Sequence, residues 1–226
     1  MHPSALPPEV VARVTARRGR PFAFPTLDPK RTALVVIDMQ NAFMAPGAAA
    51  EIPTAREIVP NINAIAAALR RAGGLVSWIQ VGVDPTQAGG GWPVLYGTLF
   101  SEATSAGYIA QLTPGTEGYA LWPGLDTHAG DLVLHKSRFS AFLPGTCELA
   151  ERLAERNIDT AIITGTLTNV CCESSARDAM MRGFKVIMVA DANATRSDAE
   201  HTASLVAIHQ VFGDVRTTAD VVRMLG

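Results

Sequence analysis

Long apolar runs, clusters of like charge and a set of paired cysteines are all missing from this sequence of 226 residues. No stretch approaches the roughly 18 to 20 apolar residues of a membrane-spanning helix, and the N-terminal region lacks the apolar segment of a signal peptide. The net charge of −2 comes from 19 basic and 21 acidic residues without long runs of one sign. Nothing in this charge pattern favours binding to nucleic acid or to an anionic membrane. We therefore expect a cytoplasmic protein that binds a small molecule, with no nucleic-acid or membrane partner.

Cysteine is scarce as well, since the chain contains only Cys147, Cys171 and Cys172. Three cysteines do not make a disulfide framework in a protein of this size, and two adjacent cysteines are poorly placed to bond to each other. We expect three reduced thiols, in keeping with a reducing compartment. Most thiols of this kind are small buried apolar groups, and this is how we interpret Cys147 and Cys172.

What the sequence does have is a regular alternation of strand and helix patterns. Hydrophobic residues make up 48% of the chain, which is enough for one sizeable core. The patterns predict strands at residues 32–37, 75–81, 131–136, 158–165, 184–191 and 214–218, and helices at 54–74, 146–157, 171–183, 197–212 and 219–225. This alternation is typical of a doubly wound α/β fold. We predict a mainly parallel, six-stranded sheet of order 3-2-1-4-5-6 with helices on both faces.

Two segments stand outside this alternation. Residues 1–31 are rich in Pro and Arg, and we expect an N-terminal arm that lies on the surface or on a neighbouring subunit. Residues 32–226 are then predicted to form a single domain. The stretch 82–131 shows only brief periodic pieces, yet every Trp and Tyr falls between Trp78 and Trp122. Long loops inside compact domains are usually functional, so we expect a lid or the walls of a substrate pocket here.

Three reactive side chains fall at the carboxyl ends of predicted strands. Asp38 ends the first apolar run, Lys136 ends the third strand, and Cys171 follows the fourth. Ligands bind outside the carboxyl ends of strands in open parallel sheets, so these groups can converge in one cleft. Lys136 is one of only three lysines beside 16 arginines, and a compact ammonium group can hold a thiolate and a carboxylate in place. Taken alone, two of these residues have ordinary interpretations: Asp38 could cap a loop, and Lys136 could be an exposed cation.

Cys171 lies at the turn from a buried strand into a helix. With Thr168 or Asn169 as the N-cap, the positive end of the helix dipole would lower the pKa of this thiol and favour the thiolate. The sequence therefore predicts a reactive cysteine at this position.

The segments ALVVIDMQNAF, LHKSRFSAF and GTLTNVCCESSARDA resemble the three motifs of the isochorismatase-like cysteine hydrolase superfamily, and the likeness extends over most of the chain. By this resemblance, Asp38, Lys136 and Cys171 form a catalytic triad. The resemblance also implies an oxyanion hole made by the backbone N–H groups of Leu167 and Cys171, with a cis peptide bond between Thr166 and Leu167.

The thiol distinguishes this chain from the enol-ether hydrolases of the superfamily, in which this position is not a cysteine. The motifs TNVC-x-E-S, KSRFSAF and VFGDV are most similar to those of ureidoacrylate amidohydrolase-type enzymes. That likeness implies a hydrolase that acts on non-peptide C–N bonds of a small amide, ureido or carbamoyl substrate. The reaction would pass through a thioester and release ammonia or an amine, and the protein would form a homodimer or homotetramer. Nicotinamidase-like members carry an Asp-x-His metal motif that WIQVGVDPTQ lacks, so we expect no metal and no cofactor.

Further candidates for the substrate pocket lie next to these motifs or at strand ends: Asn41, Phe43, Trp78, Phe139 and Gln210. Aromatic residues pack in cores as readily as they line sites, so core packing is the alternative for the three aromatic ones. Two other functions stay open. One is hydrolysis of a different carboxamide, such as a maleamate- or nicotinamide-like compound. The other is a non-enzymatic role as a thiol sensor or binding protein, although no Cys-x-x-Cys motif supports thiol exchange.

Overall fold

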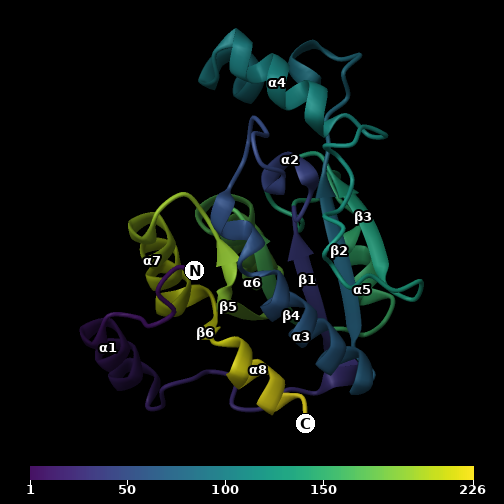
Figure 1. Ribbon diagram of the computed structural model, residues 1–226. Helices are drawn as coiled ribbons and strands as arrows, with labels where there is room; N and C mark the ends of the chain where they lie inside the picture. The colour runs from purple at the N-terminus through teal and green to yellow at the C-terminus, as the bar shows by residue number, and fades with distance from the viewer.

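The computed structural model describes all 226 residues and contains one six-stranded sheet (Figure 1). The strands are β1 (Thr32–Ile37), β2 (Leu75–Val81), β3 (Leu132–Lys136), β4 (Thr160–Thr166), β5 (Lys185–Ala194) and β6 (Asp214–Arg216). All neighbouring strands are parallel, and their order is β3-β2-β1-β4-β5-β6, which confirms the predicted fold and order. The order reverses between β1 and β4, and the carboxyl ends of strands at such a reversal form the usual ligand crevice of this fold.

The centre of the sheet is fully enclosed, whereas the β3 edge is not. Every residue of β1 and β4 is buried, as expected for apolar runs that are covered on both faces. β3 instead alternates between half-buried and exposed residues until Lys136, which is buried. The burial of a lysine at the end of an edge strand already marks this position as unusual.

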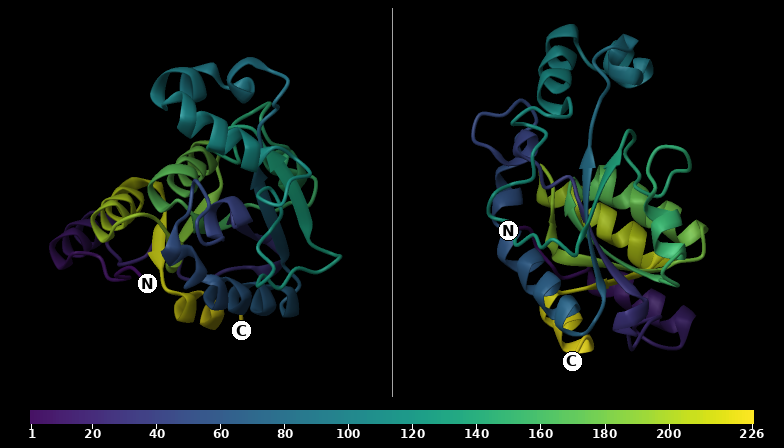
Figure 2. Two further views of the ribbon diagram at one scale, coloured as in Figure 1. Left: turned by 45° about the horizontal axis from the view of Figure 1, so that its top comes forward. Right: turned by 90° about the vertical axis from the view of Figure 1, so that its right-hand side faces the viewer.

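Helices cover both faces of the sheet, as the right-hand view of Figure 2 shows. One face is covered by α3 (Val59–Arg71) and α8 (Thr218–Met224), the other by α5 (Leu149–Ala154), α6 (Glu173–Met181) and α7 (Asp198–Ala207). The residues of α3 that follow helical spacing, Ile62, Ile65 and Leu69, are completely buried in the hydrophobic core between the sheet and the α3–α8 layer. Short turns complete the chain: η1 (Pro29–Arg31), α2 (Asn41–Met44), η2 (Pro53–Arg56), η5 (Thr168–Cys172) and η6 (Ile208–Phe212).

The N-terminal arm packs on the body of its own chain. It contains α1 (Pro8–Arg18), whose Val10 and Val14 are buried. Arg18 donates to Asp214 Oδ1 at 2.9 Å and to the carbonyl oxygen of His209 at 2.7 Å, so the arm is fixed near β6. None of the helices has the length and apolar character that a membrane span requires.

The prediction of an irregular stretch at 82–131 is wrong in part. The stretch contains η3 (Ala88–Gly91), η4 (Leu95–Leu99) and a regular helix, α4 (Glu102–Leu112). In Figure 1, α4 lies beyond the carboxyl edge of the sheet, apart from the helices that cover its faces. The helix begins at an N-cap, Ser101, whose hydroxyl accepts the Thr104 amide at 3.2 Å. Only Ser105 and Leu112 of α4 are buried, so the helix has almost no apolar face, and periodicity could not reveal it.

The end of β5 also differs from the prediction. The strand continues past Asp191 to Ala194 because the register against β4 shifts between Ile163 and Gly165, which lets Ala194 pair with Thr166. This irregularity comes immediately before the turn that carries Cys171, and bulges of this kind often re-aim the chain beside functional sites.

Candidate active site

Asp38 directly follows β1 and lies at the carboxyl edge of the sheet. Its backbone has a φ of 54°, in the left-handed region that Asp tolerates better than most residues. Its amide donates to the carbonyl of Ile79 at 2.9 Å, and its side chain is completely buried. Gln40 closes the same corner, since its side chain donates to the Val81 carbonyl at 3.0 Å and accepts the Val81 amide at 2.8 Å. Sequence reasoning did not single out Gln40, because one glutamine after an apolar run has no distinctive pattern.

Lys136 reaches Asp38 from the end of β3. Its Nζ donates to Asp38 Oδ2 at 2.8 Å and to the Arg138 carbonyl at 3.1 Å, and neither charged side chain has any exposed area. The other carboxylate oxygen, Oδ1, has no hydrogen bond of good geometry. The thiol of Cys171 is a nearby donor that interacts with this carboxyl group. The structure thus brings the three predicted residues together, with one carboxylate oxygen left for the thiol proton.

Cys171 lies in η5, the π-helical turn between β4 and α6, and is 4% exposed. The prediction that Thr168 or Asn169 caps this helix is wrong, because both residues lie inside the turn and no side chain caps it. Thr168 Oγ1 instead lies 3.0 Å from Nδ1 of His201, and Asn169 Oδ1 accepts a hydrogen bond from Thr195 Oγ1 at 2.6 Å. The polar side chains of the turn therefore bind other elements.

The three groups shift one another's pKa values. Burial raises the pKa of Cys171, and the charge of Asp38 raises it further, against the opposing effect of Lys136. Burial also raises the pKa of Asp38 above its ordinary value, although Lys136 acts to lower it. Burial alone would lower the pKa of Lys136, but the negative charges of Asp38 and Cys171 outweigh it, so this pKa is raised. The predicted low pKa of the thiol is wrong, because burial and the neighbouring carboxylate raise it by more than Lys136 lowers it.

The backbone before the cysteine turn has the expected geometry. The Thr166–Leu167 peptide bond is cis, and the Leu167 amide makes no hydrogen bond within the protein. Gly165, with a φ of 117°, allows β4 to pass close to β1, since a Cβ there would lie 2.1 Å from the Ile37 carbonyl oxygen. A side chain at this position would collide with the end of β1, immediately before Asp38.

Aromatic residues from the stretch 82–131 cover this region. Tyr96 of η4 is buried, and burial together with the charge of Cys171 raises the pKa of its phenol to about 12. The ring of Trp92 packs against that of Phe139 with 4.6 Å between centroids, and the guanidinium of Arg138 lies 4.9 Å from the Trp92 centroid. Tyr96 was not predicted individually; the only signal in the sequence was the concentration of Trp and Tyr in this stretch.

The other predicted pocket residues near this edge are Asn41 and Phe43 of α2. Asn41 Nδ2 donates to the Glu117 carbonyl at 2.9 Å, which ties α2 to the end of the 82–131 stretch. Phe43 is 5% exposed and packs in the same hydrophobic core as α3. Asn41 therefore connects two loops, Phe43 packs in the core, and neither residue has a hydrogen bond to the three reactive residues.

Trp78 and Gln210 lie away from this region, and their placement contradicts the prediction that they line the pocket. Trp78 is completely buried, and its indole donates at 2.8 Å to Asp131, which precedes β3 at the opposite edge of the sheet. Gln210 belongs to η6, which leads into the start of β6, and its carbonyl accepts from Arg17 of α1. Its position on β2 did not reveal in which direction the side chain of Trp78 points.

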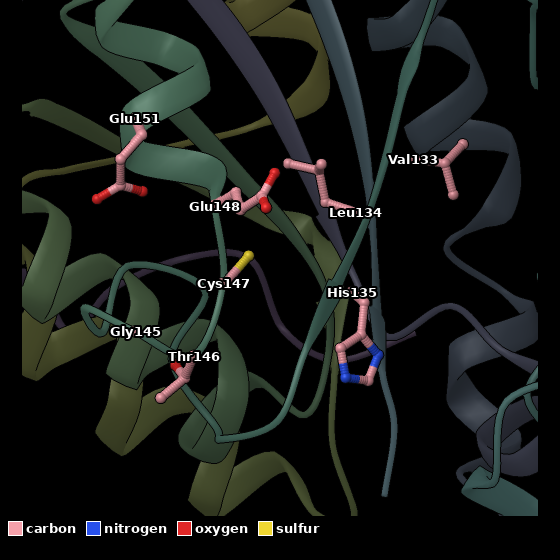
Figure 3. A pocket seen from close by; sticks show the side chains of 8 residues that line it. All are labelled: Val133, Leu134, His135, Gly145, Thr146, Cys147, Glu148 and Glu151. Carbon is pink, nitrogen blue, oxygen red and sulfur yellow. The ribbon is translucent and has the colours of Figure 1, made fainter. Parts of the chain in front are cut away.

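A separate cavity of about 570 Å³ runs along the β3 edge (Figure 3). Its side chains come from β3 and from the segment that leads into α5, and they include His135, Cys147 and Glu148. None of the three reactive residues lines it. No group of three or more His, Cys, Asp or Glu side chains is arranged to hold a metal ion.

Comparison with known proteins agrees with these features. Residues 32–220 match the isochorismatase domain family. The chain is similar to the ureidoacrylate amidohydrolase RutB of Methylobacterium radiotolerans, with 33% identity over 94% of this chain and 85% of the relative. It is also similar to the solved structure of a cysteine hydrolase from Pseudomonas syringae pv. phaseolicola 1448A, with a TM-score of 0.77 and 29% identity over 90% of this chain and 96% of that one. An isochorismatase family protein from Desulfovibrio vulgaris has a TM-score of 0.73 and 26% identity over 86% of this chain and 98% of its own.

Proposed function

The chain belongs to the isochorismatase-like hydrolase family, and we propose that it is a cysteine-dependent amidohydrolase that cleaves a C–N bond of a small ureido or carbamoyl compound. The observation that carries this proposal is the buried contact of 2.8 Å between Lys136 and Asp38, next to the thiol of Cys171. The similarity to a ureidoacrylate amidohydrolase over 94% of the chain supports the ureido group as the substrate class.

In the first half-reaction, Asp38 takes the proton of the Cys171 thiol, and Lys136 holds the carboxyl group in place. The thiolate attacks the carbonyl carbon, and the carbonyl oxygen becomes the oxyanion of a tetrahedral intermediate. The amides of Leu167 and Cys171 donate to this oxyanion. Asp38 then passes its proton to the leaving nitrogen, the C–N bond breaks, and an amine or ammonia departs.

The second half-reaction releases the acyl group from sulfur. For a ureido substrate that loses its amine, Cys171 carries an S-carbamoyl group. Asp38 takes a proton from water, the hydroxide attacks the carbonyl carbon, and the C–S bond breaks. Asp38 returns the proton to the sulfur, and the carbamate that is released decomposes to carbon dioxide and ammonia. One carboxylate therefore serves both half-reactions.

The electrostatics of the site support this scheme. A raised pKa makes Asp38 a stronger base than an ordinary carboxylate. The raised pKa of Cys171 keeps the thiol protonated until a base accepts its proton. In a dry site, fixed charges and amide dipoles act more strongly on a developing oxyanion than they do in water.

The test is release of ammonia from a panel of ureido acids, maleamate-like acids and nicotinamide-like carboxamides. We expect turnover to be fastest with a ureido acid and to be lost in Cys171→Ala. Cys172→Ala is the matched control, because Cys172 is completely buried and its thiol has only a weak contact of 3.9 Å with the Thr164 carbonyl. Undiminished ammonia release from Cys171→Ala would show that Cys171 is not the nucleophile. Consistent preference for a carboxamide over every ureido acid would rule out the substrate class.

A further inference from the structure

The turn that carries Cys171 is fixed by contacts to its first two residues. Thr168 and Asn169 lie between Leu167 and Cys171, whose amides would face the oxyanion. Thr168 Oγ1 lies 3.0 Å from His201 Nδ1 of α7, and Asn169 Oδ1 accepts from the Thr195 hydroxyl at 2.6 Å. These side-chain contacts attach the turn to α7 and to the residue that follows β5.

A single side chain from the N-terminal arm touches both anchoring residues. His2 is buried, with 8% of its surface exposed. Its ring stacks on that of His201, with 4.7 Å between centroids and 22° between planes. Its Nε2 lies 3.2 Å from the Thr195 amide nitrogen and 3.0 Å from the Thr195 carbonyl oxygen. His2 thus supports both contacts of the turn, although it does not touch the turn itself.

The hydrogen bonds of His2 hold its ring in one orientation. Its Nδ1 lies 2.6 Å from Asp198 Oδ1, and since a carboxylate only accepts hydrogen bonds, Nδ1 carries a proton. In a neutral imidazole, Nε2 then accepts the Thr195 amide proton. In an imidazolium, Nε2 donates to the Thr195 carbonyl instead. Thr195 can therefore bind the ring in either protonation state.

We propose that His2 is a positioning residue, which fixes the Leu167–Cys171 turn through His201 and Thr195 so that both amides face one oxyanion. This inference rests on the amidohydrolase function proposed above. His2 touches no reacting group, and its effect passes through Thr168 and Asn169. Because the alignment of the two amides matters most when the oxyanion forms, loss of His2 lowers kcat rather than substrate binding.

The test compares His2→Ala with His2→Phe and with a matched histidine control. His128→Ala is that control, because His128 is largely exposed and its ring contacts only Asp126. We expect His2→Ala to lower kcat about tenfold with KM within about twofold of wild type, because small misplacements of catalytic groups are costly. Hydrogen–deuterium exchange of residues 168–172 should become about tenfold faster. His2→Phe retains the ring but not the hydrogen bonds, and its effects should be intermediate.

Two further comparisons separate the possible failures. Thr195→Val removes the hydroxyl that binds Asn169 while leaving the arm untouched, and it should also lower kcat and speed exchange in the turn. Wild-type kcat and exchange rates in His2→Ala, or a lower unfolding midpoint with an unchanged turn, would overturn the inference. Exchange is measured without substrate, so it tests His2 even if the protein hydrolyses no ureido compound.

Discussion

Two carboxylates of this protein, Asp38 and Asp214, are both completely buried, yet they are bound in opposite ways. Asp214, at the start of β6, accepts hydrogen bonds at 2.9 Å from the amides of Ala23 and Phe24 and from Arg18 Nη1. Asp38, at the end of β1, accepts one well-formed bond, from a lysine, and its Oδ1 has none. A buried carboxylate with a full set of hydrogen-bond donors stabilises the fold, whereas one with an unpaired oxygen can still accept a proton from a neighbouring group.

The two regions are nevertheless connected. Asp214 holds the N-terminal arm against the amino edge of the sheet, and the same arm carries His2 to the other edge, beside the cysteine turn. In the proposed mechanism, the carboxylate with a full set of donors attaches the arm, and the carboxylate with an unpaired oxygen takes part in the reaction.

The largest effect is expected for Asp38→Asn. Asn adopts the left-handed backbone conformation as readily as Asp, so the φ of 54° is not disturbed. An amide cannot accept the thiol proton, and kcat should fall by roughly 10³ to 10⁴-fold. The measurement is the steady-state rate of ammonia release at saturating substrate. A loss of less than about tenfold would remove Asp38 from the role of base.

Lys136→Met should have the largest effect on stability. It leaves the carboxylate of Asp38 buried without its cation, which should cost about 3 to 5 kcal/mol of unfolding free energy at neutral pH. Burial already raises the pKa of Asp38, and loss of the cation would raise it further. The loss of unfolding free energy should therefore grow as the pH rises and Asp38 ionises, and it should shrink at low pH, where Asp38 is protonated. Urea titrations at two pH values measure the effect. The double variant with Asp38→Asn should regain part of the loss, and an unchanged midpoint in the single variant would contradict burial of the pair.

Asp214→Asn should show the opposite pattern to Asp38→Asn. The amide group presents a donor to the Phe24 amide and removes the charge that faces Arg18, so the unfolding free energy should fall by about 2 to 3 kcal/mol. Asp214 lies at the start of β6, at the edge of the sheet opposite to the reactive residues, and the buried valines of α1 still hold the arm in place. The value of kcat per folded molecule should therefore stay within about twofold of wild type. If the variant kept its unfolding free energy but lost kcat, the proposal that Asp214 serves stability and not the reaction would be wrong.

The smallest effect concerns the pH profile of the wild-type enzyme. In the proposed mechanism, activity requires ionised Asp38. Burial raises the pKa of Asp38 above the ordinary value of 3.8, so kcat/KM should decline on acidification before an ordinary aspartate would protonate. Below that pKa the decline should be about tenfold per pH unit. The raised pKa of Lys136 predicts no loss of its charge below its ordinary value of 10.5. An acidic limb with its midpoint at or below 3.8 would contradict the raised pKa of Asp38.

Most of the fold could be predicted because its strands are apolar runs with clear ends. The fully buried pattern of β1 and the helical spacing of α3 are direct consequences of burial on two faces and on one face. α4 could not be predicted from periodicity, since it packs against little and buries only Ser105 and Leu112. The capping position of Ser101 was the one local signal for this helix.

The proximity of Asp38, Lys136 and Cys171 was predictable, because each lies at the end of a strand and within a motif. The site was not predictable where the outcome depends on the environment. The raised pKa of Cys171 follows from burial of the whole cluster, which no single motif encodes. His2 lies 196 positions from Asp198 in the sequence, and only the folded chain brings them together.

The measurement that tests the central claim most directly is mass spectrometry of the protein quenched during turnover of a ureido acid. We predict one acyl group on Cys171, released by hydroxylamine and absent from Cys171→Ala; fragmentation assigns it, because Cys171 and Cys172 are adjacent. An acyl group on Cys172 or Cys147, or turnover with no covalent intermediate on Cys171 in the first catalytic cycle, would contradict the account.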